Sequence, residues 1–183
     1  ELFAHWCREA GMTLSVDAIG NLFARRPGTD PDAAPVMMGS HLDTQPEGGR
    51  FDGVYGVLAG LEVVRCLNDQ NIKTRKPLEI AVWTNEEGAR FTPAMFGSAV
   101  FTGIMDLQAA LAVRDANGIS VAEELQRLGY AADRALGGAV DAYFEAHIEQ
   151  GPILEDNAKS IGVVSGGQAI RWLDVRVEGM AAH

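Results

Sequence analysis

The spacing of hydrophobic positions changes several times along this chain, and each change predicts a different element. Apolar residues at helical spacing predict helices over residues 2–10, ending at Gly11, and over residues 54–67. Ser120 and Glu123 have the spacing of a capping box, which predicts a third helix reaching Leu128. Residues 91–103 are expected to form a loop. Short apolar or alternating runs predict strands over residues 13–16, 21–25, 34–38, 78–83, 141–147, 160–164 and 170–177.

Strands that alternate with helices predict an α/β fold with a mixed, largely parallel sheet flanked by helices. Four short polar segments follow apolar runs in this pattern, at residues 39–43, 51–53, 84–88 and 146–151. Ligands of such sheets bind beyond the carboxyl ends of the strands. We therefore expect the four segments to meet at one edge of the sheet.

The first two segments offer a histidine and two aspartates. His41 and Asp43 are two residues apart, so on an extended segment their side chains face the same way, and Asp43 could hold the imidazole in one orientation. A simple turn cluster is the alternative. Asp52 lies between glycine-rich residues at the start of a predicted helix, where it could bridge two metal ions or could only cap the helix.

The last two segments add two glutamates and a second histidine. Glu86 and Glu87 are adjacent, so one could bind a metal ion while the other takes a proton from an attacking water. An exposed acidic loop is the alternative. His147 could be a further ligand or an ordinary polar residue, and the amide of Gln150 suits a ureido or amide substrate. Mixed histidine and carboxylate ligands fit zinc, manganese, cobalt or nickel.

Composition and charge narrow the class of protein. The 183 residues are 47% hydrophobic and 22% charged, which is ordinary for a globular domain. The formal net charge of −10 argues against nucleic acid or an anionic membrane as a partner. Cys7 and Cys66 have no motif spacing, which favours reduced thiols in a cytoplasmic protein. Neither a membrane span nor a signal peptide is recognisable, although the chain starts at Glu1 without a methionine.

Four motifs resemble those of one enzyme family. They are Gly-Ser-His-Leu-Asp-Thr at 39–44, Gly-Gly-Arg-Phe-Asp-Gly-Val-Tyr-Gly at 48–56, Asn-Glu-Glu-Gly-Ala-Arg-Phe at 85–91 and His-Ile-Glu-Gln-Gly-Pro at 147–152. Together they resemble the N-carbamoyl-L-amino-acid hydrolases, a group that includes β-ureidopropionase and allantoate amidohydrolase. The group belongs to the superfamily of aminoacylases and glutamate carboxypeptidases.

The resemblance implies a role for each candidate residue. It implies two divalent metal ions per subunit, with His41 and His147 on one ion, Glu87 on the other and Asp52 between them. It also implies that Glu86 is the general base, that Asp43 orients His41 and that Gln150 contacts the ureido group.

The end of the chain resembles the start of a smaller α+β lid and dimerisation domain. Gly-Met-Ala-Ala-His at 179–183 is similar to a family motif whose histidine polarises the scissile carbonyl, a role that would fall to His183. The resemblance therefore divides the chain into residues 1–166, part of a metallopeptidase-like catalytic domain, and residues 167–183, the start of the lid. It also implies a homodimeric parent enzyme, of which this chain would be a fragment lacking a metal ligand and the arginine for the substrate carboxylate.

The implied reaction is metal-dependent hydrolysis of the ureido C–N bond of an N-carbamoyl amino acid, giving the amino acid, carbon dioxide and ammonia. Hydrolysis of allantoate is the nearest alternative, and an aminoacylase or dipeptidase is more distant because of His147 and Gln150. The alternative from another class is a catalytically inactive fragment.

Overall fold

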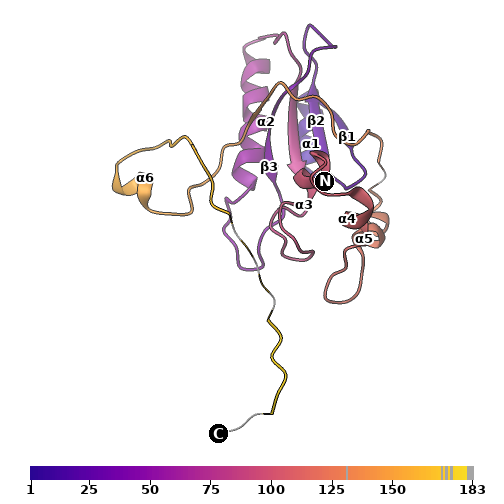
Figure 1. Cartoon of the computed structure of the whole chain (residues 1–183). Coiled ribbons are helices and arrows are strands. Elements are labelled where there is room, and N and C mark those ends of the chain that lie inside the picture. Colours follow the sequence, from indigo (N-terminus) through magenta and orange to yellow (C-terminus); the bar gives the residue numbers. More distant parts are fainter. Residues whose placement is uncertain (131, 170, 172, 174, 181–183) are drawn as a thin grey trace. The chain divides into compact units, whose positions relative to one another are not determined.

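The computed structural model describes every residue except 131, 170, 172, 174 and 181–183 (Figure 1). The chain divides into two compact units, Glu1–Ile148 and Glu149–His183. This division falls before residue 167, where the lid is expected to begin, and the assignment of a catalytic domain and a lid stays a prediction. The described elements are α1 (Leu2–Glu9), β1 (Thr13–Val16), β2 (Leu22–Arg26), β3 (Val36–His41), α2 (Val54–Asp69), β4 (Leu78–Trp83), α3 (Phe96–Phe101), α4 (Leu107–Ala112), α5 (Val121–Leu128), β5 (Ala142–Phe144) and α6 (Ile153–Asp156).

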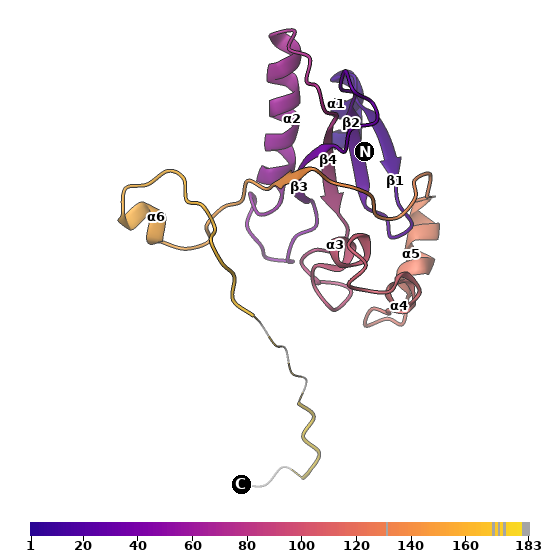
Figure 2. The same ribbon diagram turned by 45° about the horizontal axis from the view of Figure 1, so that its top comes forward.

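The first unit is built on one five-stranded sheet with the strand order β1-β2-β4-β3-β5 (Figure 2). Strand β3 pairs in parallel with β4 and with β5, whereas β2 pairs antiparallel with β1 and with β4. The prediction of a mixed α/β sheet flanked by helices is therefore confirmed. Two of the four strand pairings in this sheet are parallel, those of β3 with β4 and with β5, so the sheet is parallel only in part. These three strands precede three of the four polar segments.

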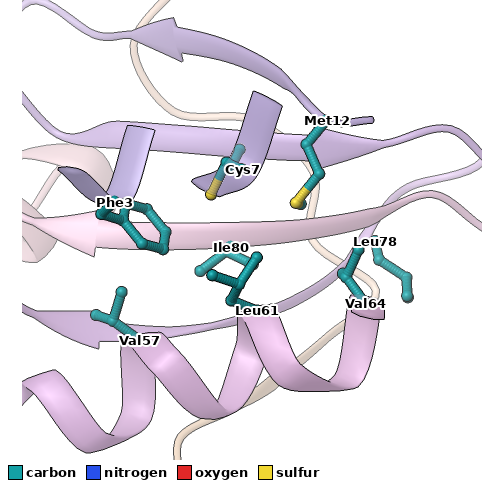
Figure 3. Packing of buried hydrophobic residues seen from close by; sticks show 9 residues of the cluster. Phe3, Cys7, Met12, Val57, Leu61, Val64, Leu78 and Ile80 are labelled. Carbon is teal, nitrogen blue, oxygen red and sulfur yellow. The ribbon is translucent and has the colours of Figure 1, made fainter. Parts of the chain in front are cut away.

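Helices α1 and α2 cover one face of this sheet and form the main hydrophobic core with it (Figure 3). The apolar stripe of α2 supplies Val57, Leu61 and Val64, which are at most 2% exposed. Alternate residues of the strands, such as Ile80, meet this stripe because successive side chains of a strand point to opposite faces. Gly60 lies where an added Cβ would be 3.3 Å from the Ile80 side chain, so the helix approaches the sheet closely.

Most elements lie within two residues of their predicted positions, with a few exceptions. The capping box at Ser120 and Glu123 is present with both of its hydrogen bonds. The loop expected over residues 91–103 contains α3, and α4 follows it, so the loop prediction was wrong there. The strand expected over 141–147 is shorter, at Ala142–Phe144.

The second unit contains α6, and its other described residues have no regular secondary structure. The strand predicted over 160–164 is therefore absent. A further strand was predicted over 170–177. Residues 170, 172 and 174 lie outside the described residues, and the others in this range form no strand. Across the described part of the chain, no helix is both long and apolar enough to cross a membrane.

The opposite face of the sheet buries a charged group. Glu79 on β4 is 1% exposed, and its carboxylate oxygens lie 2.9 Å from Nη1 of Arg134 and 3.4 Å from Nη1 of Arg25. The Arg134 guanidinium also stacks over the Phe23 ring, 3.8 Å from its centre. A carboxylate removed from water needs such partners, so Arg134 joins the loop before β5 to the sheet.

Replacing Arg134 with Ala should lower the free energy of unfolding by about 3 kcal/mol, because it leaves a buried carboxylate short of a partner. Urea unfolding followed by tryptophan fluorescence measures the change. Arg75→Ala is the matched control, since Arg75 pairs with Asp30 at the surface, where such pairs contribute about 0–1 kcal/mol. Equal effects of the two substitutions would contradict a structural role for the Glu79–Arg134 pair.

Candidate functional site

The candidate residues gather at the carboxyl ends of the three parallel strands. His41 is the last residue of β3 and pairs in register with Trp83, the last residue of β4. Glu86 and Glu87 follow β4 closely, and His147 lies three residues after the end of β5. The register therefore brings residues that are up to about a hundred positions apart in sequence to one edge of the sheet, as the strand pattern predicted.

Two histidines converge on one carboxylate at this edge. Nε2 of His147 lies 3.0 Å from Oδ1 of Asp52, and Nε2 of His41 lies 3.6 Å from the same oxygen. One ligand atom from each of the three residues lies within 4.8 Å of the others. His41 is 2% exposed and Asp52 is 8% exposed, so most of this cluster is shielded from water.

The other ring nitrogens set the tautomers of the two histidines. Nδ1 of His41 lies 2.8 Å from the main-chain oxygen of Asp43, and Nδ1 of His147 lies 2.8 Å from that of Ile148. A carbonyl oxygen only accepts, so in the neutral rings each Nδ1 carries the proton and each Nε2 presents a lone pair. Two lone pairs and a carboxylate that face one another repel unless a positive charge lies among them. The donor set therefore fits a divalent cation.

The backbone around Asp52 explains why that residue can reach the histidines. Gly53 has a φ of +68°, and a Cβ added there would lie 2.5 Å from Cε1 and Nδ1 of His41. Only glycine combines this backbone conformation with such close contact. Helix α2 begins at Val54 with Gly53 as its N-cap, and no side chain caps it. Asp52 therefore precedes the N-cap position instead of occupying it.

Asp43 connects the first polar segment to the third. Its two carboxylate oxygens accept hydrogen bonds from the main-chain N–H groups of Glu86, at 3.2 Å, and Glu87, at 3.0 Å. Its Oδ1 lies 3.7 Å from Nδ1 of His41, so the short contact to that ring comes from the Asp43 main chain. Asp43 thus holds the backbone that carries the glutamates, and its predicted part in catalysis stays a prediction.

Glu86 contacts the cluster formed by His41, Asp52 and His147, whereas Glu87 is held by a hydrogen bond from outside it. Oε2 of Glu86 lies 3.4 Å from Nε2 of His41. Burial raises the pKa of Glu86, the nearby His41 opposes the rise, and the neighbouring carboxylates, with Glu87 first, add to it. Oε2 of Glu87 accepts a hydrogen bond of 3.2 Å from the amide of Gln45 and lies outside the three-residue cluster. Its role as a ligand stays a prediction.

Sequence reasoning missed a hydrogen-bonded chain beside the cluster. Nε1 of Trp83 donates to the Tyr143 hydroxyl at 2.9 Å, and that hydroxyl donates to Oε2 of Glu145 at 2.8 Å. The Ser40 hydroxyl donates to Oε1 of Glu145 at 2.5 Å. The available signal was the alternation of Tyr143, Glu145 and His147, which places three polar side chains at strand spacing.

The remaining candidates belong to the second unit. Gln150 has a φ of +55° in the turn before α6, and its contact with a ureido group stays a prediction. Glu149 accepts hydrogen bonds from the N–H groups of Ile153 and Leu154, at 3.0 and 2.9 Å, and so holds the start of α6. His183 lies outside the described residues.

Similarity to characterised proteins agrees with this site. The chain is 55% identical over 183 residues to an N-carbamoyl-L-amino-acid amidohydrolase of Rhizobium meliloti, covering all of this chain and 44% of that protein. It is 44% identical to an N-carbamoyl-L-amino acid amidohydrolase of Geobacillus stearothermophilus, covering all of this chain and 46% of the relative. The chain therefore spans less than half the length of these relatives.

A solved structure shows the same fold. A hydantoinase/carbamoylase family amidase from Burkholderia ambifaria superimposes with a TM-score of 0.89 at 72% identity, covering 91% of this chain and 41% of that one. Residues 37–182 match the sequence pattern described as Peptidase family M20/M25/M40, and this stretch contains every candidate residue except His183. The chain belongs to the peptidase family M20/M25/M40.

Proposed function

We propose that the protein to which this chain belongs hydrolyses the ureido C–N bond of N-carbamoyl amino acids in a metal-dependent reaction. The observation that carries the proposal is the convergence of His41, His147 and Asp52, with the Glu86 carboxylate 3.4 Å from His41 Nε2. The names of the relatives at 55% and 44% identity support the choice of N-carbamoyl amino acids as substrates. A relative named allantoate amidohydrolase is more distant, at 34% identity.

The proposed cofactor is a pair of divalent ions, such as zinc, manganese, cobalt or nickel. His41, His147 and Asp52 would hold one ion, and Asp52 and Glu87 would contribute to the second. When bound, such ions lower the pKa of water from 15.7 towards ~7 and stabilise negative charge on a carbonyl oxygen. With Nδ1 of each histidine bonded to a carbonyl oxygen, Nε2 is the ring nitrogen that would bind the ion.

Glu86 would perform the proton transfers. Water attacks the carbamoyl carbon as its proton passes to the Glu86 carboxylate, and the same proton then passes to the amino-acid nitrogen as the C–N bond breaks. The amino acid leaves with that proton, and the carbamate that remains decomposes to carbon dioxide and ammonia. The Asp43 carboxylate holds the main-chain N–H groups of Glu86 and Glu87, which keeps the base beside the cluster. These bonds do not use the side-chain carboxylate of Glu86.

The substrate contacts complete the proposal. The Gln150 amide would bind the ureido group, because it can both donate and accept hydrogen bonds. His183 would polarise the scissile carbonyl, and a donor to a developing oxyanion is typically worth about 3–4 kcal/mol. The complete protein is proposed to act as a homodimer.

Ammonia release by the complete product of the reading frame that encodes residues 1–183 tests this function. We expect turnover of N-carbamoyl-L-amino acids that exceeds turnover of allantoate and of N-acetyl amino acids. A chelator should abolish the turnover, and zinc or manganese should restore it, because the donor set is built for a cation. Preference for allantoate would identify the alternative substrate, and chelator-resistant activity would contradict the metal site. Residues 1–183 expressed alone are the control for an inactive fragment and should show no turnover.

A further inference from the structure

The segment that carries His147 extends past the backbone pairing that should hold it. Strand β5 pairs with β3 through Ala142, Tyr143 and Phe144, opposite residues 36–38. Strand β3 continues to His41, three residues further, whereas His147 follows Phe144 without ladder bonds to β3. The His147 side chain is also 36% exposed, compared with 2% for His41. Contacts other than the ladder must therefore place His147 beside Asp52.

The hydrogen-bonded chain through Glu145 supplies such a contact. Each of the three parallel strands gives it one side chain: Trp83 from β4, Ser40 from β3 and Tyr143 from β5. The indole N–H can only donate, so the Tyr143 hydroxyl accepts from Trp83 and passes its own proton to Glu145. Both oxygens of Glu145 are thereby occupied by hydroxyl donors from different strands. Hydrogen bonds to an ionised carboxylate are stronger than neutral ones.

The hydrogen-bonded residues lie next to the ligands of the His41–Asp52–His147 cluster in sequence. Ser40 adjoins His41, and Glu145 lies two residues before His147. The Ser40–Glu145 bond of 2.5 Å therefore ties together the two segments that end in the histidines. Gly56 at the start of α2 packs on the same place, where an added Cβ would lie 2.5 Å from the Ala146 oxygen and 2.9 Å from Cβ of Ser40.

We propose that Glu145 is a positioning residue that sets the affinity of the His41–Asp52–His147 cluster for its divalent ion. By bridging Ser40 and Tyr143, it holds the His147 segment where Nε2 lies 3.0 Å from Asp52. The ion then binds ligands that are already in place, which lowers the ordering cost of binding. The inference rests on the proposed function only in that it assumes a metal ion at this cluster.

Zinc affinity of the metal-free complete protein, measured by competition with a coloured chelator, tests the proposal. Glu145→Ala should bind zinc about 10- to 100-fold more weakly, the usual effect of losing a partner that orients a ligand. Glu145→Gln should lie between this variant and the wild type, because the amide oxygen can still accept from Ser40. Tyr143→Phe, which removes one of the two hydroxyl donors, should weaken binding less than Glu145→Ala. Glu155→Ala changes an exposed glutamate on α6 and is the matched control, with unchanged affinity expected.

The melting temperature of the metal-free protein separates positioning from general stability. We expect it to be nearly the same in wild type and in Glu145→Ala, while the rise in melting temperature on adding zinc shrinks in the variant. Zinc affinity of Glu145→Ala and Tyr143→Phe within twofold of wild type would overturn the proposal. A metal-free protein that melts far below wild type in both variants would also overturn it. Failure of the wild type to bind zinc would instead overturn the proposed function, so the two failures are distinguishable.

Discussion

Glu86→Gln in the complete protein is expected to lower turnover of N-carbamoyl amino acids by about 100- to 10,000-fold, the range that general acid–base catalysis typically contributes. The substitution keeps the size and shape of the side chain but replaces a proton acceptor with an amide that cannot take the proton. The main-chain N–H of residue 86 would still donate to Asp43, so the side chain should stay in place. Single-turnover and steady-state rates measure the effect.

The neighbouring glutamate provides the control for this experiment. Glu87→Gln changes the same chemical group one residue away, and we expect it to reduce the bound metal, whereas Glu86→Gln should retain the wild-type metal content. Elemental analysis of both variants separates a lost base from a lost ligand. Near-normal turnover by Glu86→Gln would refute its role as the base, and an equal loss of metal in both variants would assign Glu86 to the ligands.

Asp52→Ala should empty both proposed metal positions and abolish turnover. Its Oδ1 atom lies 3.0 Å from Nε2 of His147 and 3.6 Å from Nε2 of His41, so one oxygen atom lies near both histidines. Without it, two neutral imidazoles remain. We expect affinity to fall by more than the roughly 10- to 100-fold that follows loss of an outer partner.

Elemental analysis after dialysis against a metal buffer measures this loss. Asp69→Ala is the control, because Asp69 is an exposed aspartate at the far end of the same helix, α2. The melting temperatures of the metal-free proteins should be recorded with the metal contents, since a misfolded variant would also lose metal. Two metal ions per chain in correctly folded Asp52→Ala would refute the bridging role.

Strong local patterns made much of the fold predictable. The apolar residues of α2 recur at helical spacing from Val57 to Val64, and the Ser120 capping box consists of residues only three positions apart, so both elements were found from sequence. Helix α3 was missed because Gly97, Ser98 and Val100 are poor helix formers. Its position depends on a distant residue, Asn21, whose amide donates to the Gly97 oxygen at 3.0 Å. No local pattern contains that contact.

The opposite error occurred at Ser160–Val164. These residues have the β-branched composition of a strand, but a strand requires a partner for its backbone groups, and the described part of the chain provides none there. Composition alone cannot report whether a partner strand exists.

The residues of the candidate site could be predicted from the sequence, but most of the hydrogen bonds between them could not. Strand ends identify His41, Glu86 and His147 as neighbours, because parallel strands bring their carboxyl ends to one edge, whereas Asp52 lies just before α2. The contact of Asp43 with the N–H groups of Glu86 and Glu87 depends on the register of β3 with β4, which hydrophobic patterns do not specify. The bond between Ser40 and Glu145 spans 105 residues and depends on the pairing of β3 with β5.

The Asp43 carboxylate has a further consequence for how this site can change by mutation. Because one side chain holds the peptide groups of both glutamates, the proposed base and the proposed ligand share a single anchor on another strand. The effects of substitutions at Asp43, Glu86 and Glu87 should then be non-additive, as they are for residues in one hydrogen-bonded network. Such epistasis favours inheritance of the two segments as one block, so that directed evolution would have to vary them together.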